Sequence, residues 1–200
     1  MLIYVITDRT RRPDLTPETI IDAVADSGAD MIQIREKDLG GLALLRLTRR
    51  AVASAHPGVF VNGRADVAMA ASAAGVHLPS RGCPASDIRR AWPGRLRIGV
   101  STHSLEEATG AERDGADFIT FGPVFDTPSK RAFGAPVGIA ALERVARSVR
   151  LPVLAIGGVD ATRVRDLRSA GAAGAAVISA VITAPDMRRA VERLRDAALA

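Results

Sequence analysis

Short uninterrupted runs of apolar residues alternate with longer amphipathic segments along the whole chain. The runs have no polar alternation, which is typical of strands buried on both faces in a parallel sheet. Between them, apolar residues recur at the three- and four-residue spacing of helices that pack one face on such a sheet. We therefore expect strands at residues 2–6, 30–35, 59–61, 75–78, 96–100, 118–121, 153–156 and 175–179.

Helix start and stop signals lie between these strands. Thr16 before Pro17, and Ser104 three residues before Glu107, are typical of helix N-termini. A glycine at the end of a helix commonly stops it, and one precedes every second predicted strand. These glycines are Gly28, Gly75, Gly115 and Gly171. The expected helices cover residues 16–28, a stretch from 41, 65–73, 84–91, 104–115, 140–149, 160–170 and 184–199.

The alternation of strands and helices predicts the fold class. Eight strand–helix units of about 25 residues account for the 200-residue chain, which matches a (β/α)₈ TIM barrel in a single domain over residues 1–200. A doubly wound open sheet is the competing α/β architecture, but it does not require eight units. The barrel is therefore the preferred prediction.

Composition and charge narrow the function classes. The chain is 48% hydrophobic and 24% charged, with a net charge of +5. The arginines are scattered with no long basic block, so we expect a small anionic ligand and no nucleic-acid partner. Cys83 is the only cysteine, which excludes an intramolecular disulfide and a multi-cysteine metal site. The first apolar run is too short for a signal peptide or a membrane span, so a cytoplasmic location is expected.

Working groups of such a barrel follow the carboxyl ends of its strands. Gly157 and Gly158 end the seventh predicted strand, and Ile178 and Ser179 end the eighth. Glycines allow backbone N–H groups to approach an anion closely, and a serine adds a hydroxyl. These four residues are the candidate phosphate site, and a tight turn without a ligand is the alternative interpretation.

Gln33, Arg35 and Lys37 occupy alternate positions at the end of the second predicted strand. On an extended strand these three long polar side chains would point to the same side. Burying such a row costs free energy unless a ligand or a carboxylate forms hydrogen bonds or ion pairs with it. A substrate-binding role is therefore favoured over a structural network.

Histidines and one long loop supply further candidates. His103 could act as a general base, because histidine titrates near neutrality, or be hydrogen-bonded within its loop. His77 lies between apolar residues and is interpreted as a core residue. Residues 122–138 form the longest predicted loop, in which Thr127, Ser129 and Lys130 could grip a phosphate or remain solvated.

Several segments together resemble the thiamine-phosphate synthase superfamily. They are residues 4–9 (YVITDR), 33–38 (QIREKD), 98–104 (IGVSTHS), 121–125 (FGPVF), 127–130 (TPSK), 155–158 (AIGG) and 177–179 (VIS). The resemblance implies a (β/α)₈ barrel of thiamine biosynthesis. Its synthases join an aminopyrimidine diphosphate to a thiazole phosphate with loss of pyrophosphate.

The resemblance also implies residue roles. The diphosphate would be bound by Gln33, Arg35, Lys37, Asn62, Thr127, Ser129 and Lys130. The thiazole phosphate would be bound by Gly157, Gly158, Ile178 and Ser179.

Two positions depart from the synthase pattern. Synthases carry an aspartate after the asparagine of strand three and an acidic residue after strand four, and these carboxylates hold magnesium. Here the positions read Asn62-Gly63 and residues 79–82 (PSRG), so no metal ligand is expected. This variation resembles the TenI-type thiazole tautomerases. The histidine of their FGHVF segment is Pro123 here, which leaves His103, Lys37 or a water held by Ser101 as catalytic candidates.

The leading hypothesis is a TenI-type thiazole tautomerase, an isomerase without a cofactor that aromatises a thiazole carboxylate phosphate. The alternative is a thiamine-phosphate synthase, a transferase that uses Mg²⁺. A third hypothesis is a non-catalytic regulator that binds thiazole phosphate. The expected partner is a small phosphorylated thiazole, with a homodimer as an option and no nucleic acid or membrane.

Overall fold

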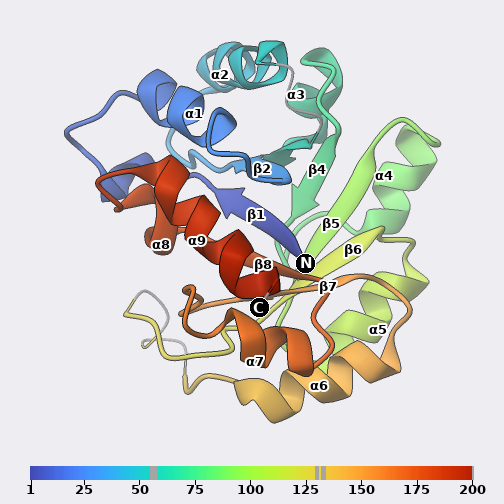
Figure 1. Cartoon of the computed structure of the whole chain (residues 1–200). Coiled ribbons are helices and arrows are strands. Elements are labelled where there is room, and N and C mark those ends of the chain that lie inside the picture. Colours follow the sequence, from blue (N-terminus) through green and yellow to red (C-terminus); the bar gives the residue numbers. More distant parts are fainter. Residues whose placement is uncertain (55–57, 129–130, 132–133, 200) are drawn as a thin grey trace.

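The computed structural model describes residues 1–54, 58–128, 131 and 134–199 (Figure 1). Its strands are β1 (Leu2–Ile6), β2 (Met31–Ile34), β3 (Val59–Asn62), β4 (Gly75–Leu78), β5 (Arg97–Thr102), β6 (Phe118–Phe121), β7 (Val153–Ile156) and β8 (Gly174–Val177). All are parallel, each pairs with the next along the chain, and β8 pairs with β1. The sheet is therefore closed, which confirms the predicted (β/α)₈ barrel and excludes the open sheet.

Helices surround the strands on the outside of the barrel (Figure 1). They are α1 (Pro17–Ala25), α2 (Gly41–Ala53), α3 (Ala65–Ala70), α4 (Ala85–Ala91), α5 (Leu105–Arg113), α6 (Gly138–Ser148), α7 (Val164–Ser169), α8 (Ser179–Ile182) and α9 (Met187–Leu199). A short 3₁₀ helix, η1 (Arg9–Arg11), follows β1. Within the described residues, no helix is both long and apolar enough to cross a membrane.

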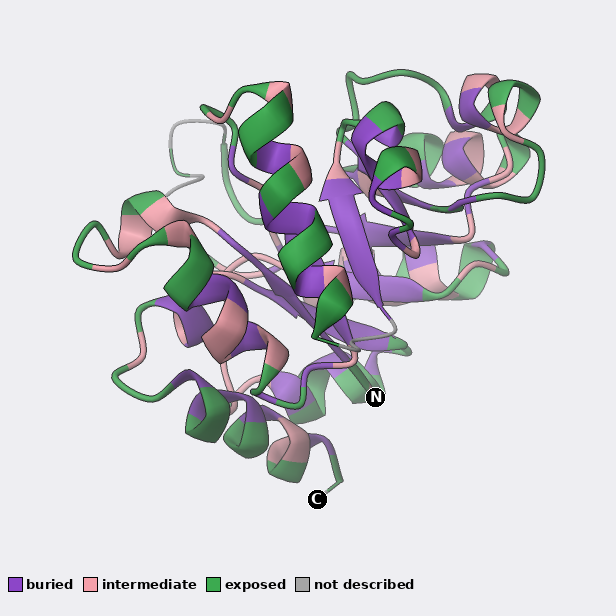
Figure 2. Ribbon diagram, turned by 90° about the horizontal axis from the view of Figure 1, so that it is seen from above, coloured by how far each residue is buried: buried purple, intermediate pink, exposed green. Residues whose placement is uncertain are grey.

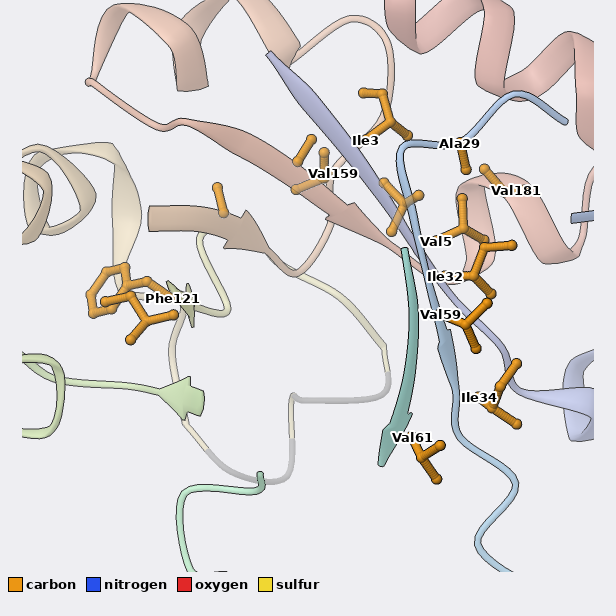
Figure 3. Packing of buried hydrophobic residues seen from close by; sticks show 14 of the residues in the cluster. Ile3, Val5, Ala29, Ile32, Ile34, Val59, Val61, Phe121, Val159 and Val181 are labelled. Atoms are coloured by element: carbon orange, nitrogen blue, oxygen red, sulfur yellow. The ribbon is translucent and has the colours of Figure 1, made fainter. Parts of the chain in front are cut away.

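Alternate side chains of the strands pack into two separate apolar layers, because successive strand residues point to opposite faces. The outer layer lies between strands and helices. Figure 3 shows Val5, Ile32, Ile34, Val59 and Val61 on one side of three adjoining strands. The helices turn their buried residues toward this layer and their exposed residues to solvent (Figure 2).

The inner layer fills the barrel. It consists of Tyr4, Ile6, Met31, Phe60, Phe118, Leu154 and Ala176. The rings of Tyr4, Phe60 and Phe118 meet edge to face, with centroids 5.3–5.9 Å apart. Edge-to-face pairs of this kind add stability beyond their buried area. The three rings form a solid floor beneath the carboxyl ends of the strands.

The predicted helix signals act as expected at most positions. The hydroxyl of Thr16 accepts a hydrogen bond from the Thr19 N–H at 3.1 Å, and Ser104 accepts one from the Glu107 N–H at 3.1 Å. Gly28, Gly115 and Gly171 have φ values of +77°, +86° and +85°, in the left-handed conformation of a helix stop.

Gly75 is an exception, because it is a strand residue and does not stop a helix. The preceding turn instead uses Ser72, with φ of +55°. A Cβ at Gly75 would lie 2.1 Å from the Arg97 carbonyl oxygen and 2.6 Å from the Phe60 ring. Close packing between strands therefore explains this glycine.

Two predicted helices begin later than expected. Asp160 accepts hydrogen bonds from the Thr162 N–H and hydroxyl, which makes a turn before α7. Pro185 precedes α9, and Asp186 accepts from the Arg189 N–H at 2.9 Å in the manner of an N-cap. Local side-chain hydrogen bonds thus shorten both helices.

Candidate active site

A cavity of about 310 Å³ opens at the carboxyl ends of the strands. It brings together all the sequence-predicted site residues that the structure describes. These are Gln33, Arg35, Lys37, Asn62, Ser101, His103, Thr127, Gly157, Gly158, Ile178 and Ser179. Ser129 and Lys130 lie outside the described residues.

Two turns form one side of the cavity, after β7 and β8. Gly157 and Gly158 have φ values of +97° and +63°. A Cβ at Gly157 would lie 2.5 Å from the Cα of Pro123, and one at Gly158 would lie 2.6 Å from the Asp126 carbonyl oxygen. Both positions therefore require glycine, and they line the same cavity as Ser179 at the start of α8.

A cationic group forms another side, after β2 and β3. The strand β2 ends at Ile34, so Arg35 and Lys37 lie in the following loop rather than on an extended strand, contrary to the expectation. All the same, both line the cavity together with Gln33 and Asn62. The backbone N–H of Arg35 donates a hydrogen bond to the Thr7 hydroxyl at 3.0 Å, which ties the start of this loop to the residue after β1.

The loop after β2 has two carboxylates, Glu36 and Asp38, and neither lines the cavity. Glu36 is only 6% exposed and accepts a hydrogen bond from the Arg9 N–H at 3.2 Å. Burial raises its pKa above the ordinary value, and the hydrogen bond with Thr7 partly offsets that shift. Asp38 pairs with the side chain of Arg9. Both acids thus fix the loop and leave Arg35 and Lys37 facing the ligand space.

A buried chain of hydrogen bonds runs beneath the cavity. Gln33 Nε2 donates to the Tyr4 hydroxyl at 3.0 Å, and the Tyr4 oxygen lies 3.3 Å from His77 Nδ1. His77 Nε2 lies 3.0 Å from the Ser101 oxygen. Burial lowers the pKa of His77 to about 3, so the ring is neutral, and burial raises the pKa of Tyr4.

The tautomer of His77 sets the direction of this chain. The Tyr4 hydroxyl has one hydrogen and two lone pairs, so it accepts from Gln33 and either donates to His77 Nδ1 or accepts from it. With the ring proton on Nε2, the Ser101 oxygen accepts from His77; with the ring proton on Nδ1, the Ser101 hydroxyl donates to Nε2. In either arrangement the chain links Gln33 to Ser101 beneath the cavity.

His103 has its tautomer set by the backbone. Its Nδ1 lies 2.5 Å from the carbonyl oxygen of Gly122, which can only accept, so Nδ1 carries the proton. Nε2 is therefore the ring nitrogen that remains for a ligand, and His103 lines the cavity. The arrangement makes His103 a candidate acid/base group.

Known proteins resemble this chain over nearly its whole length. The family described as thiamine monophosphate synthase matches residues 3–181. A thiamine-phosphate synthase of Roseiflexus castenholzii is 43% identical over 98% of this chain and 88% of its own length. One of Methanoculleus marisnigri is 41% identical over 97% of this chain and 93% of its own.

The chain belongs to the thiamine monophosphate synthase family. It is accordingly an enzyme of thiamine biosynthesis. A solved thiamine phosphate pyrophosphorylase of Pyrococcus furiosus superposes with a TM-score of 0.89 at 35% identity, covering 99% of this chain and 95% of that one. These relatives are named thiamine-phosphate synthases. Their names favour the synthase, which was the alternative hypothesis from the sequence, over the thiazole tautomerase, which was the leading one.

The donor set of this family member does not fit a magnesium ion held by the protein. No aspartate or glutamate is among the described residues that line the cavity, and no group of three or more His, Cys, Asp or Glu in the described chain could hold a metal. Magnesium prefers carboxylate oxygens. Gly63 and Ser80, near the two expected metal positions, offer none.

His77 and Arg11 are among the cavity residues that sequence reasoning did not assign to the site. His77 was placed in the core, and it is buried there, but it also lines the cavity floor. Its position in a strand two residues before Pro79 could have indicated this, since strand residues near the carboxyl end face the mouth. Arg11 was not singled out, and its place within a run of basic residues after β1 was the available signal.

Proposed function

We propose that the chain is a thiamine-phosphate synthase. It would join an aminopyrimidine methyl diphosphate to a thiazole phosphate and release pyrophosphate. The observation that carries this proposal is a single cavity lined by two groups of candidate anion-binding residues. Arg35 and Lys37 follow β2, whereas the turns with Gly157, Gly158 and Ser179 follow β7 and β8, so β1 lies between the two groups in the closed barrel. The names of the relatives support the same reaction.

Each side has a distinct task in the proposed reaction. The turns at Gly157, Gly158 and Ser179 would hold the thiazole phosphate. Arg35 and Lys37 would bind the diphosphate and stabilise the negative charge that develops on it. The bond between the methylene carbon and the diphosphate oxygen breaks, the electron pair leaves with pyrophosphate, and the thiazole nitrogen bonds to that carbon. Positioning both substrates supplies a large part of the acceleration.

Side-chain cations would take the place of a protein-held metal in this site. The described lining contains Arg11, Arg35 and Lys37 and no aspartate or glutamate, and Asp8, outside the lining, lies within 4 Å of both Arg11 and Arg35. Guanidinium and ammonium groups donate charge-assisted hydrogen bonds to phosphate oxygens. The donor set thus favours diphosphate binding by the protein itself.

Two substitutions test the division of tasks. Arg35→Met is expected to raise KM for the pyrimidine diphosphate by about 10-fold or more and to change KM for the thiazole phosphate less than about twofold. Ser179→Ala is expected to do the opposite. Arg12→Met is the control, since Arg12 pairs with Asp14 outside the cavity. Equal effects of Arg35→Met on both substrates would contradict the assignment.

Thiazole tautomerisation is a second candidate, favoured by one observation. His103 lines the cavity, and because its Nδ1 bonds to the Gly122 carbonyl oxygen, Nε2 is the ring nitrogen left for proton exchange with a ligand. A tautomerase should aromatise the thiazole carboxylate phosphate, and His103→Gln should slow that reaction about 100-fold. Absence of this activity in the native protein would exclude the candidate.

A further inference from the structure

Arg11, near the N-terminus, reaches the side of the cavity formed by the turns after β7 and β8. It is the last residue of η1, directly after β1. Its NH1 nitrogen donates to the Ser179 hydroxyl oxygen at 3.1 Å across 168 residues of sequence. The guanidinium lines the cavity and remains one-third exposed. A cation therefore lies beside the turn after β8, where the resemblance implies only Gly, Ile and Ser.

The hydrogen-bond direction orients Ser179. An arginine has no acceptor, so the Ser179 oxygen accepts from Arg11 and its own hydrogen is free to point elsewhere. The NH2 nitrogen of Arg11 has no hydrogen-bond partner within the described residues. One guanidinium thus presents an unused N–H edge and also sets a neighbouring hydroxyl as a donor.

Asp8 holds the Arg11 guanidinium in place. Its Oδ2 lies 3.5 Å from Arg11 Nε and 3.7 Å from an Arg35 terminal nitrogen. One carboxylate therefore lies between two guanidinium groups and cancels only one of their charges. Because Asp8 approaches Nε and Ser179 approaches NH1, the remaining edge of Arg11 is left for a ligand.

Arg163 and Arg12, two other arginines near this side of the cavity, bind other groups of the protein. Arg163 donates to the Gly158 carbonyl oxygen at 2.5 Å and stacks over Phe125 at 4.7 Å. Arg12 is adjacent to Arg11 in sequence but is bound to Asp14 and to the Ala184 carbonyl oxygen. Neither is among the residues that line the cavity.

We propose that Arg11 is a phosphate ligand that makes the site selective for a phosphate monoester over the free alcohol. This inference rests on the proposed function for the identity of the ester, a thiazole phosphate. The glycine turns supply neutral N–H donors, whereas a phosphate dianion gains more from a charge-assisted donor. Arg11 would supply this charge together with the Ser179 hydroxyl.

The test compares three ligands across matched variants. Calorimetry measures the Kd of thiazole phosphate, of the corresponding thiazole alcohol and of inorganic phosphate with native protein, Arg11→Met, Arg11→Lys and Arg12→Met. Arg11→Met is expected to weaken thiazole phosphate and inorganic phosphate about 10- to 100-fold and the alcohol less than about twofold. Arg11→Lys should weaken phosphate binding by an intermediate factor, because lysine keeps the positive charge but lacks the paired N–H donors of a guanidinium group. Arg12→Met should stay within about twofold of the native protein for every ligand.

Melting curves in the absence of ligand show whether each variant is folded. Equal weakening of phosphate and alcohol, or no change in either, would overturn the role of Arg11. Turnover is measured separately. Phosphate binding that depends on Arg11 without formation of thiamine phosphate would uphold this inference and refute the proposed function.

Discussion

Lowering the pH should destabilise the protein through one buried histidine. The pKa of His77 is about 3 in the folded protein against 6.5 in an exposed chain, because burial disfavours the charged ring. Between these values the unfolded chain binds a proton that the folded protein does not. Stability is therefore lost as the pH falls from 6.5 toward 3. From pH 8 to 5 the loss is about 2 kcal/mol, because the slope rises to about 1.4 kcal/mol per pH unit below the unfolded pKa of 6.5.

The measurement is urea unfolding of the native protein and of His77→Asn at several pH values from 8 to 5. His77→Asn is less stable at pH 8, because the contacts with Tyr4 and Ser101 are altered. The stability difference between the two proteins should shrink by about 2 kcal/mol between pH 8 and 5. Glu36, whose pKa is raised, shifts stability in the opposite sense but is common to both proteins. A difference that stays constant with pH would refute the neutral buried ring.

Two other substitutions probe the site and the fold. Gly157→Ala places a methyl group 2.5 Å from Pro123 at a φ of +97°, so the turn must shift. We expect calorimetry to show an affinity for thiazole phosphate at least about 10-fold lower, whereas Gly40→Ala, which meets nothing within 4 Å, should leave it within about twofold. Asp117→Asn weakens an oxygen that accepts from a backbone N–H and a guanidinium, both at 2.6 Å. Urea unfolding should show a loss of about 1–3 kcal/mol, against less than about 0.5 kcal/mol for Asp22→Asn in an exposed pair.

Much of the barrel was predictable from local sequence, because each strand is an apolar run bounded by polar or glycine residues. The seventh strand and its two glycines show this clearly, since the positive φ values and the absence of room for a Cβ match the expectation. The boundaries of α7 and α9 were not predictable from periodicity. They depend on the side-chain hydrogen bonds of Asp160 and Asp186 with backbone N–H groups.

The candidate site divides in the same way. Residues at the carboxyl ends of strands were predicted to face one mouth, and Gln33 in β2 and Asn62 at the end of β3 do so because all strands are parallel. Contacts between distant segments were not predictable. Tyr4 and His77 are 73 residues apart, and their partnership depends on strands meeting across the barrel interior. The sequence analysis favoured the tautomerase branch because two metal-binding carboxylates are missing, whereas the names of the relatives favour the synthase.

Product formation by the purified protein tests the central claim most directly. Protein treated with a chelator is incubated with the aminopyrimidine diphosphate and the thiazole phosphate, and thiamine phosphate and pyrophosphate are quantified. The proposed synthase predicts equal amounts of both products, with side-chain cations sufficient for turnover. A strict requirement for added magnesium would keep the reaction but contradict the role given to Arg35 and Lys37. No thiamine phosphate under either condition would contradict the account.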